Sequence, residues 1–403
     1  MTAHVTCLGC GCACDDIEIV TRDGVIGDAK NACELGVRWF GDGRVPARCR
    51  VAGRDVSVDA ALAAAADLFA RATRPLVYLA PDISCEAQRE AAGIADALGA
   101  ALDSVTSATA MPSILAAQER GRASATLGEI RNRADVVVLW CLDPAVAYPR
   151  YLSRYAPESA GRTFIRVDIA AADEVATLTV LAAIVSGHAV DKASPTGPAW
   201  ARARELAPRL LAGRYVAIVA DAEAAADDTE PRDPGRASAL IALAQALNGP
   251  TRAALSLLRA GGNRSGADAV MTSQTGYPMS VDFAHGYPLY RPHDGAAEAR
   301  LARGDVDALL LIGAAALVPA DVLAQMARVP RVVIGPRSSE SPLNQGDVVI
   351  DTGIAGIHEG GTALRMDDVP LPLRPSVTGP PDAAGVARAL GRLVRSRREV
   401  SAR

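Results

Sequence analysis

The chain of 403 residues has a formal net charge of −4, and 50% of its residues are hydrophobic. The negative charge argues against broad nucleic-acid binding, which relies on basic surface that neutralises phosphates. No apolar run approaches the ~20 residues of a membrane-spanning helix, and the opening MTAHVTCLGCGC lacks the positive and long apolar segments of a signal peptide. We therefore expect a cytoplasmic protein that binds neither nucleic acid nor membrane.

Cysteines are concentrated near the N-terminus, where five of the eight lie within the first 33 residues. Cys7, Cys10 and Cys14 share one tight loop, and Cys33 follows from a later turn. Such clustering in a cytosolic chain indicates metal or redox chemistry. Soft thiolates bind zinc or iron–sulfur clusters, and a compact loop with one distant ligand can enclose a [4Fe–4S] cluster. Three interpretations stay open: a [4Fe–4S] cluster, zinc, or an empty loop of buried thiols.

The other cysteines lack this spacing. Cys12 lies inside the loop but outside the pattern, and core packing is predicted for Cys49, Cys85 and Cys141. The five histidines show no HxH or HExxH zinc spacing.

Three further segments have a structural and a chemical interpretation. His285 and His293 are predicted to be structural histidines, or else to line a cofactor cavity. The run from Gly261 to Gly266 predicts a tight turn before a helix, with an anion cradle as the alternative. Asp15 and Asp16 suit turn or capping duty better than acid–base catalysis.

From Pro75 onward, short apolar runs alternate with amphipathic segments rich in Ala and Leu. The expected strands are 76–79, 136–140, 163–167, 216–219, 309–312, 332–334 and 348–350. The expected helices are 59–72, 86–98, 199–212, 237–247 and 319–326, and Asp59 suits the cap of the first. Unalternated strands suit a parallel sheet buried on both faces, and strand–helix alternation predicts an α/β fold with two sheets.

Two segments are expected to lie outside this alternation of strands and helices. The stretch 221–236 is predicted to be a loop. The basic stretch 388–403 is predicted to be a solvated helix and tail, with a subunit contact as the alternative.

The opening CLGCGCACDDIEI resembles the start of the B subunit of formylmethanofuran dehydrogenase, a molybdopterin oxidoreductase. The resemblance continues in residues 112–140, 275–290 and 358–373, so it covers most of the chain.

One departure concerns the metal ligand. The dehydrogenase family has Cys-His-Gly-Pro-Ser, whose cysteine ligates tungsten or molybdenum. Here Thr109 and Ala110 replace the cysteine and the histidine, whereas Pro112 and Ser113 are kept. A neutral hydroxyl is a poor ligand for a soft metal, and an alanine cannot move protons.

Two further departures affect the same cofactor. The Gly-Ser-Asn-Pro turn that helps to hold the pterin dinucleotide corresponds to residues 141–144, CLDP, and its downstream histidine to Tyr148. The Arg-rich stretch after TGYP instead contains His285, Leu289 and the sequence RPHD at 291–294.

The resemblance implies an α/β fold of Rossmann-like, parallel-sheet αβα domains of the molybdopterin oxidoreductase (formate dehydrogenase-like) type. It implies a small Cys-rich N-terminal lobe (1–52), a first αβα segment (53–132), an inserted Rossmann-like αβα domain (133–300), a second αβα segment (301–380) and a basic C-terminal tail (381–403).

A chain with this framework but without the metal ligand is similar to B subunits of the formyltransferase/hydrolase complexes of methylotrophs. That similarity implies a non-redox structural subunit of a hetero-oligomer that passes a formyl group from tetrahydromethanopterin to methylofuran and releases formate. The implied partners are the transferase, hydrolase and other subunits, with the methylofuran carrier nearby. Catalytic residues, pterin, tungsten and molybdenum are not expected. The alternatives are an active formylmethanofuran dehydrogenase and an iron–sulfur electron-transfer module.

Overall fold

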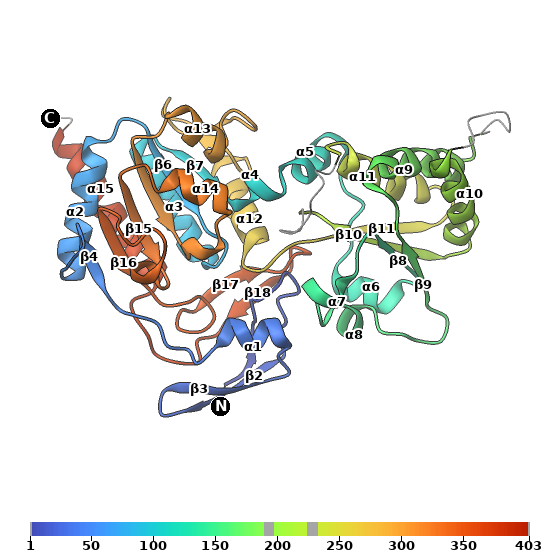
Figure 1. Ribbon diagram of the computed structural model, residues 1–403, viewed down its shortest axis with the longest axis horizontal. Coiled ribbons are helices and arrows are strands. Elements are labelled where there is room, and N and C mark those ends of the chain that lie inside the picture. Colours follow the sequence, from blue (N-terminus) through green and yellow to red (C-terminus); the bar gives the residue numbers. More distant parts are fainter. Residues whose placement is uncertain (1, 189–196, 224–232, 402–403) are drawn as a thin grey trace. The chain divides into compact units, whose positions relative to one another are not determined.

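The computed structural model describes residues 2–188, 197–223 and 233–401 (Figure 1). The chain forms two compact units: unit 1 comprises Met1–Thr109 and Gly261–Arg403, and unit 2 comprises Ala110–Ala260. The predicted domain boundaries at 132/133 and 300/301 therefore differ from the boundaries between unit 1 and unit 2, at 109/110 and 260/261. The reason is local packing, since α5 (Met111–Arg120) packs on α11 (Arg236–Leu247), and β12 (Val281–Asp282) pairs with β7 (Ala101–Ser104).

Unit 1 begins with a three-stranded antiparallel sheet in the order β1-β2-β3, followed by one short helix. These elements are β1 (Thr2–Val5), β2 (Ile17–Arg22), β3 (Val25–Lys30) and α1 (Glu34–Phe40). The loop between β1 and β2 contains Cys7, Cys10 and Cys14. The predicted lobe of 1–52 overlaps the main sheet, because β4 (Cys49–Val51) already pairs with β16 (Val348–Asp351).

The main sheet of unit 1 has nine strands in the order β13-β12-β7-β6-β14-β15-β16-β4-β5. Its centre is parallel and consists of β7, β6 (Pro75–Leu79), β14 (Ala308–Ile312), β15 (Arg331–Gly335) and β16. Its antiparallel edges consist of β12 and β13 (Leu289–Tyr290) on one side and β4 and β5 (Arg54–Asp55) on the other. A separate hairpin pairs β17 (Gly361–Leu364) with β18 (Pro370–Leu373).

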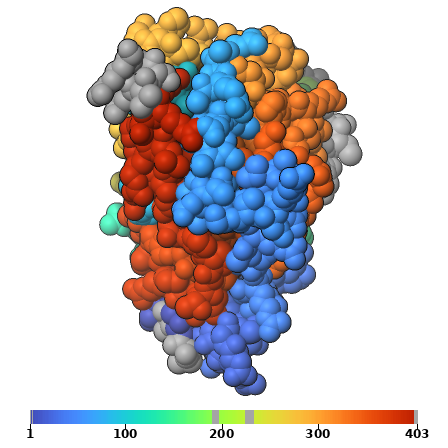
Figure 2. Space-filling view, turned by 90° about the vertical axis from the view of Figure 1, so that its left-hand side faces the viewer, coloured from blue at the N-terminus to red at the C-terminus, as the bar shows by residue number. Residues whose placement is uncertain are grey.

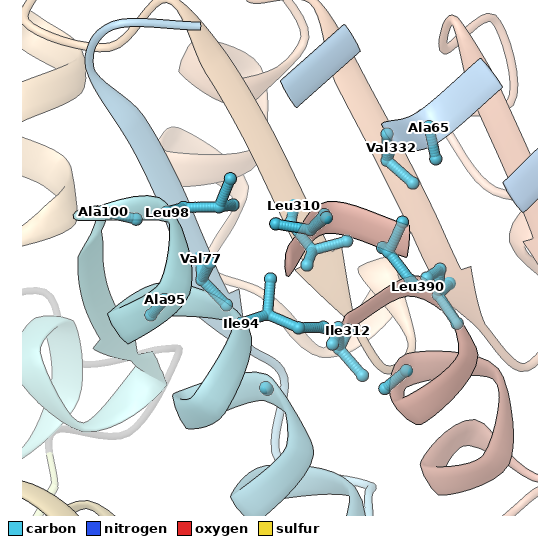
Figure 3. Close-up of a cluster of buried hydrophobic side chains, with 14 of the residues drawn as sticks. Ala65, Val77, Ile94, Ala95, Leu98, Ala100, Leu310, Ile312, Val332 and Leu390 are labelled. Carbon is cyan, nitrogen blue, oxygen red and sulfur yellow. The ribbon is translucent and has the colours of Figure 1, made fainter. Parts of the chain in front are cut away.

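Helices cover both faces of this sheet. The helices of unit 1 after α1 are α2 (Val58–Arg71), α3 (Cys85–Leu98), α4 (Val105–Thr109), α12 (Arg264–Thr275), α13 (Ala297–Arg303), α14 (Ala320–Met326) and α15 (Ala383–Ser401), with 3-10 turns η1 (Ala315–Leu317) and η2 (Ser338–Glu340). Val77 and Leu310 face the helices α2, α3 and α15 (Figure 3), whereas Leu76 and Leu309 face α13 and α14. Because successive residues enter opposite cores, these strands have no polar face.

The C-terminal segment is a helix for most of its length. Figure 2 shows α15, in red, beside α2, in blue. Val386, Leu390 and Val394 of α15 are buried in the core that α2 and α3 share. The predicted basic tail of 381–403 is therefore an integral helix over Ala383–Ser401, because its apolar stripe covers the sheet.

Unit 2 has one parallel sheet in the order β11-β10-β8-β9. Its strands are β8 (Val136–Trp140), β9 (Thr163–Val167), β10 (Tyr215–Asp221) and β11 (Arg252–Leu258). Its helices are α5, α6 (Leu127–Arg133), α7 (Pro144–Ala147), α8 (Tyr151–Tyr155), α9 (Ala171–Val185), α10 (Pro198–Leu211) and α11. A buried cluster that includes Val138, Leu181 and Leu240 joins this sheet to its helices.

These sheets confirm the predicted mixed α/β fold with parallel strands, and each predicted strand and helix overlaps an observed one. One predicted detail is wrong: α2 is capped by Ser57, whose Oγ accepts the Ala60 N–H at 3.2 Å, and Asp59 lies one position into the helix. In the predicted loop of 221–236, residues 224–232 lie outside the described residues, while Asp221 ends β10 and Arg236 begins α11. Among the described residues, no helix combines the length and apolarity needed to cross a membrane.

Candidate functional site

The structure brings together the four cysteines of the predicted metal set. The loop is closed by a backbone hydrogen bond from Cys7 N–H to Cys14 C=O at 2.9 Å, and Cys33 stands at the N-cap of α1. Burial raises the pKa of the Cys7 thiol, and the nearby thiols of Cys10, Cys14 and Cys33 raise it further. Cys10, Cys14 and Cys33 therefore lie close enough to Cys7 to interact with it electrostatically, although Cys33 is outside the loop, at the start of α1.

The surroundings of this loop are tightly packed. The Gly9 N–H donates to Cys7 Sγ at 3.4 Å, and a Cβ at Gly36 would meet that sulfur at 3.3 Å. A hydrogen bond from Cys12 to Cys10, with burial, raises the pKa of the Cys12 thiol. In the described ranges, no group of three or more His, Cys, Asp or Glu side chains is arranged around a single-ion position.

The glycine run before α12 packs against the cysteine loop. The Gly262 N–H donates to Leu8 C=O at 2.8 Å, and the Asn263 N–H donates to Pro81 C=O. A Cβ at Gly261 would meet the Gly9 oxygen at 2.7 Å. The backbone amides of Gly262 and Asn263 thus bind the chain itself, which matches the predicted turn and not the anion cradle.

Two buried carboxyl groups lie at the carboxyl end of the nine-stranded sheet. Asp82 follows β6 and accepts the Ala314 N–H after β14 at 2.8 Å. Strand order reverses between β6 and β14, the position where open α/β sheets bind ligands. Glu359 accepts the Ser84 hydroxyl at 2.6 Å and the Ala383 N–H at 2.9 Å. Burial raises the pKa of Asp82 to about 6 and that of Glu359 to about 7.

This pair predicts a pH-dependent stability. The folded chain binds protons more tightly than the unfolded chain, so the free energy of unfolding is expected to fall as the pH rises from 4.5 to about 7. The full change for Glu359 is up to about 3 kcal/mol. The variant Glu359→Gln should show a flatter profile, with a remaining slope from Asp82, in urea unfolding at a series of pH values. A profile parallel to that of the wild type would contradict the assignment to Glu359.

Thr109 occupies the position at which the resemblance places a metal-ligating cysteine. It ends α4, and its hydroxyl donates to Val105 C=O at 3.0 Å. The same hydroxyl accepts a hydrogen bond from Arg264 Nη1 at 3.2 Å. A neutral hydroxyl is a weak ligand for a soft metal, and this hydroxyl already donates to Val105 and accepts from Arg264. These residues do not fit a tungsten or molybdenum centre.

The turn that corresponds to the pterin-binding turn follows β8 in unit 2. Cys141 has a φ of 47°, and Asp143 caps α7 by accepting the Ala145 N–H at 3.0 Å. Burial raises the pKa of the Cys141 thiol to about 11, so this thiol stays protonated near neutral pH. Both side chains have local structural roles.

Charged side chains bridge the carboxyl ends of β8 and β10. The strand order in the sheet of unit 2 reverses between these two strands. Arg236 donates to Glu174 at 2.7 Å and to Asp221 C=O at 2.9 Å. Glu174 also accepts the Trp140 indole N–H at 2.7 Å. Both members of the ion pair are buried.

The remaining histidine and aspartate candidates are exposed or form structural hydrogen bonds. His285 and His293 are exposed, on the segments around β13. His358 accepts the Ile354 N–H at Nδ1, and its Nε2 lies 2.7 Å from Gly43 C=O, so it is a neutral structural residue. Near the cysteine loop, the Asp16 carbonyl accepts the Asn31 amide N–H at 3.0 Å, which fits the predicted turn role.

Sequence reasoning missed Asp82 and Glu359. Asp82 comes three residues after the buried run 76–79, and a carboxylate directly after a parallel strand is a signal for the carboxyl edge of a sheet. Glu359 carries no such signal, because its position depends on a contact with Ser84 that is distant in sequence.

Comparison with known proteins gives concordant relatives, although no family model matches the chain. The B subunit of the tungsten-containing formylmethanofuran dehydrogenase 2 of Methanocaldococcus jannaschii is 32% identical over 94% of both chains. That of Methanococcus maripaludis is 31% identical, also over 94% of both. The B subunit of the formyltransferase/hydrolase complex Fhc of Methylorubrum extorquens is 29% identical over 77% of this chain and 86% of its own.

A solved structure agrees with these relatives. A chain in the crystal structure of the formyltransferase/hydrolase complex FhcABCD from Methylorubrum extorquens, in complex with methylofuran, matches with a TM-score of 0.69 and 26% identity. The match covers 86% of this chain and 99% of that one. The predicted resemblance is therefore confirmed, and the chain belongs to the family of formylmethanofuran dehydrogenase B subunits.

Proposed function

We propose that this chain is a non-redox structural subunit of a cytoplasmic, hetero-oligomeric formyltransferase/hydrolase complex. In that assembly a formyl group passes from tetrahydromethanopterin to a methylofuran carrier, and a hydrolase subunit releases it as formate. The chain supplies neither active site, and its partners are the transferase, hydrolase and remaining subunits. The likeness to the Fhc B subunit and to a chain of FhcABCD supports membership of such a complex.

The hydrogen bond between Arg264 and Thr109 is the observation that carries the non-redox role. It puts a fixed positive charge and a hydroxyl where the tungsten enzymes of the family have a thiolate. In this proposal the chain keeps the molybdopterin oxidoreductase type of fold, with its Cys-rich N-terminal lobe, and uses that fold as a structural framework. Holding two active sites together raises the effective concentration of a shared carrier to the order of mM for short linkers, which is a sufficient reason to keep the framework.

The variant Thr109→Ala tests this role. It removes the hydrogen bonds of the hydroxyl with Arg264 and with Val105 C=O, which costs about 1–2 kcal/mol of stability, and it should leave formate release by the purified complex unchanged. Subunit composition should also be unchanged on size-exclusion chromatography. Loss of formate release from a fully assembled Thr109→Ala complex would mean that this position takes part in the reaction.

We also propose that Cys7, Cys10, Cys14 and Cys33 hold a [4Fe–4S] cluster, because the first three share one loop and the thiols of Cys10, Cys14 and Cys33 are near enough to Cys7 to raise its pKa. When bound, such a cluster supplies one-electron transfer. The loop's own contribution is to shield the sulfurs from water and to donate the Gly9 N–H to Cys7.

Anaerobic purification tests the cluster. The wild type and the matched control Cys49→Ser should contain about four irons per chain and absorb near ~400 nm, whereas Cys33→Ser should lose most of both. Cys49 lies on β4 of the main sheet, away from the cysteine loop in sequence. Stoichiometric zinc, or wild-type protein without metal, would reject the cluster.

Two other functions make different predictions. An active formylmethanofuran dehydrogenase would contain pterin and tungsten or molybdenum despite Thr109. An electron-transfer module would need its cluster for the overall reaction, so Cys33→Ser would then abolish turnover by the assembled complex. The structural role predicts that the Cys33→Ser complex, when assembled, still releases formate.

A further inference from the structure

Unit 2 contains a concave pocket at the amino ends of β10 and β11, with a volume of about 540 Å³. It is formed by the end of α5 and the segment that follows it, by the C-terminal part of α11, and by the first residues of the two strands. Ligands of open α/β sheets usually bind at the carboxyl ends of the strands. This pocket is at the opposite end of the sheet and is therefore distinct from the positions of Cys141 and Arg236.

Hydrogen bonds hold the wall of the pocket in place. The Arg120 carbonyl accepts the Gln245 side-chain N–H at 2.7 Å, which joins the end of α5 to α11. The Leu255 N–H donates to Ala123 C=O at 2.6 Å, which ties the segment after α5 to β11. The backbone of the concavity is thus held in place before a ligand binds, which lowers the entropic cost of binding.

Positive charge dominates the lining. Arg120, Arg122 and Arg252 line the pocket, and no Asp or Glu of the described residues is part of its lining. The Arg252 guanidinium lies 5.4 Å from the centre of the Tyr215 ring and 3.1 Å from Glu129, while its side chain stays 61% exposed. The neighbouring Glu129 carboxylate pairs with Arg252.

We propose that this pocket binds a small polyanion that carries at least two carboxylate or phosphate groups. Guanidinium groups form paired hydrogen bonds with both kinds of anion, so their shared chemistry defines the ligand class. The volume lies in the range of about 300–1,000 Å³ that is usual for small-molecule sites. The proposal is independent of the Thr109 and cysteine sites, since it uses only residues of unit 2.

Isothermal titration of the purified full chain, with any subunits that co-purify, tests the proposal. Inorganic pyrophosphate and citrate are the probes, and their relative affinities separate a phosphate ligand from a carboxylate ligand. Saturable binding of at least one probe is expected, and Arg122→Gln and Arg252→Gln should each weaken it about tenfold. Added salt should weaken binding further.

The variant Arg214→Gln is the matched control. It removes the same charge beside the start of β10, but Arg214 is outside the pocket lining and pairs with Asp135. Its affinity for the probes should equal that of the wild type. Absence of saturable binding for both probes, or an equal loss in Arg214→Gln and the pocket variants, would overturn the proposal. Unchanged thermal midpoints would show that all variants are folded.

Discussion

The variant Arg236→Met is expected to lower the free energy of unfolding by about 3–5 kcal/mol. In the wild type, Arg236 and Glu174 form an ion pair of 2.7 Å whose side chains are only 7% and 8% exposed. Removing the guanidinium leaves the Glu174 carboxylate buried, with a hydrogen bond from the neutral Trp140 indole N–H but without its counter-ion. A buried charge without its counter-ion is costly, because little water reaches it. Urea unfolding followed by circular dichroism measures the loss.

The exposed pair of Arg209 and Glu205 provides a matched control. Its atoms are 3.5 Å apart, and its side chains are 43% and 51% exposed. Arg209→Met should therefore change the free energy of unfolding by less than about 0.5 kcal/mol. The double variant Arg236→Met/Glu174→Gln should recover part of the loss, since the glutamine is neutral and still accepts from Trp140. Equal losses in Arg236→Met and Arg209→Met would show that burial of the pair does not determine its contribution.

The variant Gly262→Ala is expected to destabilise unit 1 by about 3 kcal/mol or more. Gly262 has a φ of 94°, and an added Cβ would overlap the Pro81 carbonyl oxygen. The segment cannot simply move away, because the Gly262 N–H also binds Leu8 C=O in the cysteine loop. Strain at this position should therefore reach the cysteine loop as well as the end of β6. Urea unfolding measures the loss of stability.

Gly93 provides the opposite case within the same unit. It lies in α3, and an added Cβ would have no neighbour within 4 Å. Gly93→Ala should stabilise the chain by roughly 0.5–1 kcal/mol, because alanine loses less backbone entropy in a helix. If Gly262→Ala were as stable as the wild type, the close packing of the glycine run against Pro81 would be incorrect.

The sequence predicts strands well where both faces are buried. The run 136–140 is VVVLW, and the observed β8 has the same bounds. Prediction from the sequence misses β7, whose sequence ALDS contains two polar residues. It also misses β11, whose Ala- and Leu-rich RAALSLL has the composition of a helix. Tertiary pairing determines both strands, since each lies beside an apolar strand of its own sheet.

The candidate site is predictable only in part for a similar reason. Cys7, Cys10 and Cys14 are close in sequence, so their spacing alone indicates a shared loop, whereas Cys33 follows from a later turn. The contacts of Thr109 with Arg264 and of Ser84 with Glu359 join residues 155 and 275 positions apart. No local pattern encodes such contacts. The observed unit boundaries differ from the predicted domain boundaries for the same reason, because β12 joins the main sheet of unit 1 only through its pairing with β7.

The most direct test of the proposed non-redox role is elemental and cofactor analysis of the intact complex, purified without oxygen, together with two assays. The non-redox role predicts no stoichiometric molybdenum or tungsten, no pterin after acid release, no reduction of a viologen dye by a formyl donor, and formate release by the assembly. Stoichiometric molybdenum or tungsten with pterin and formyl-dependent dye reduction would contradict that role, because the Thr109 position would then support a working redox centre.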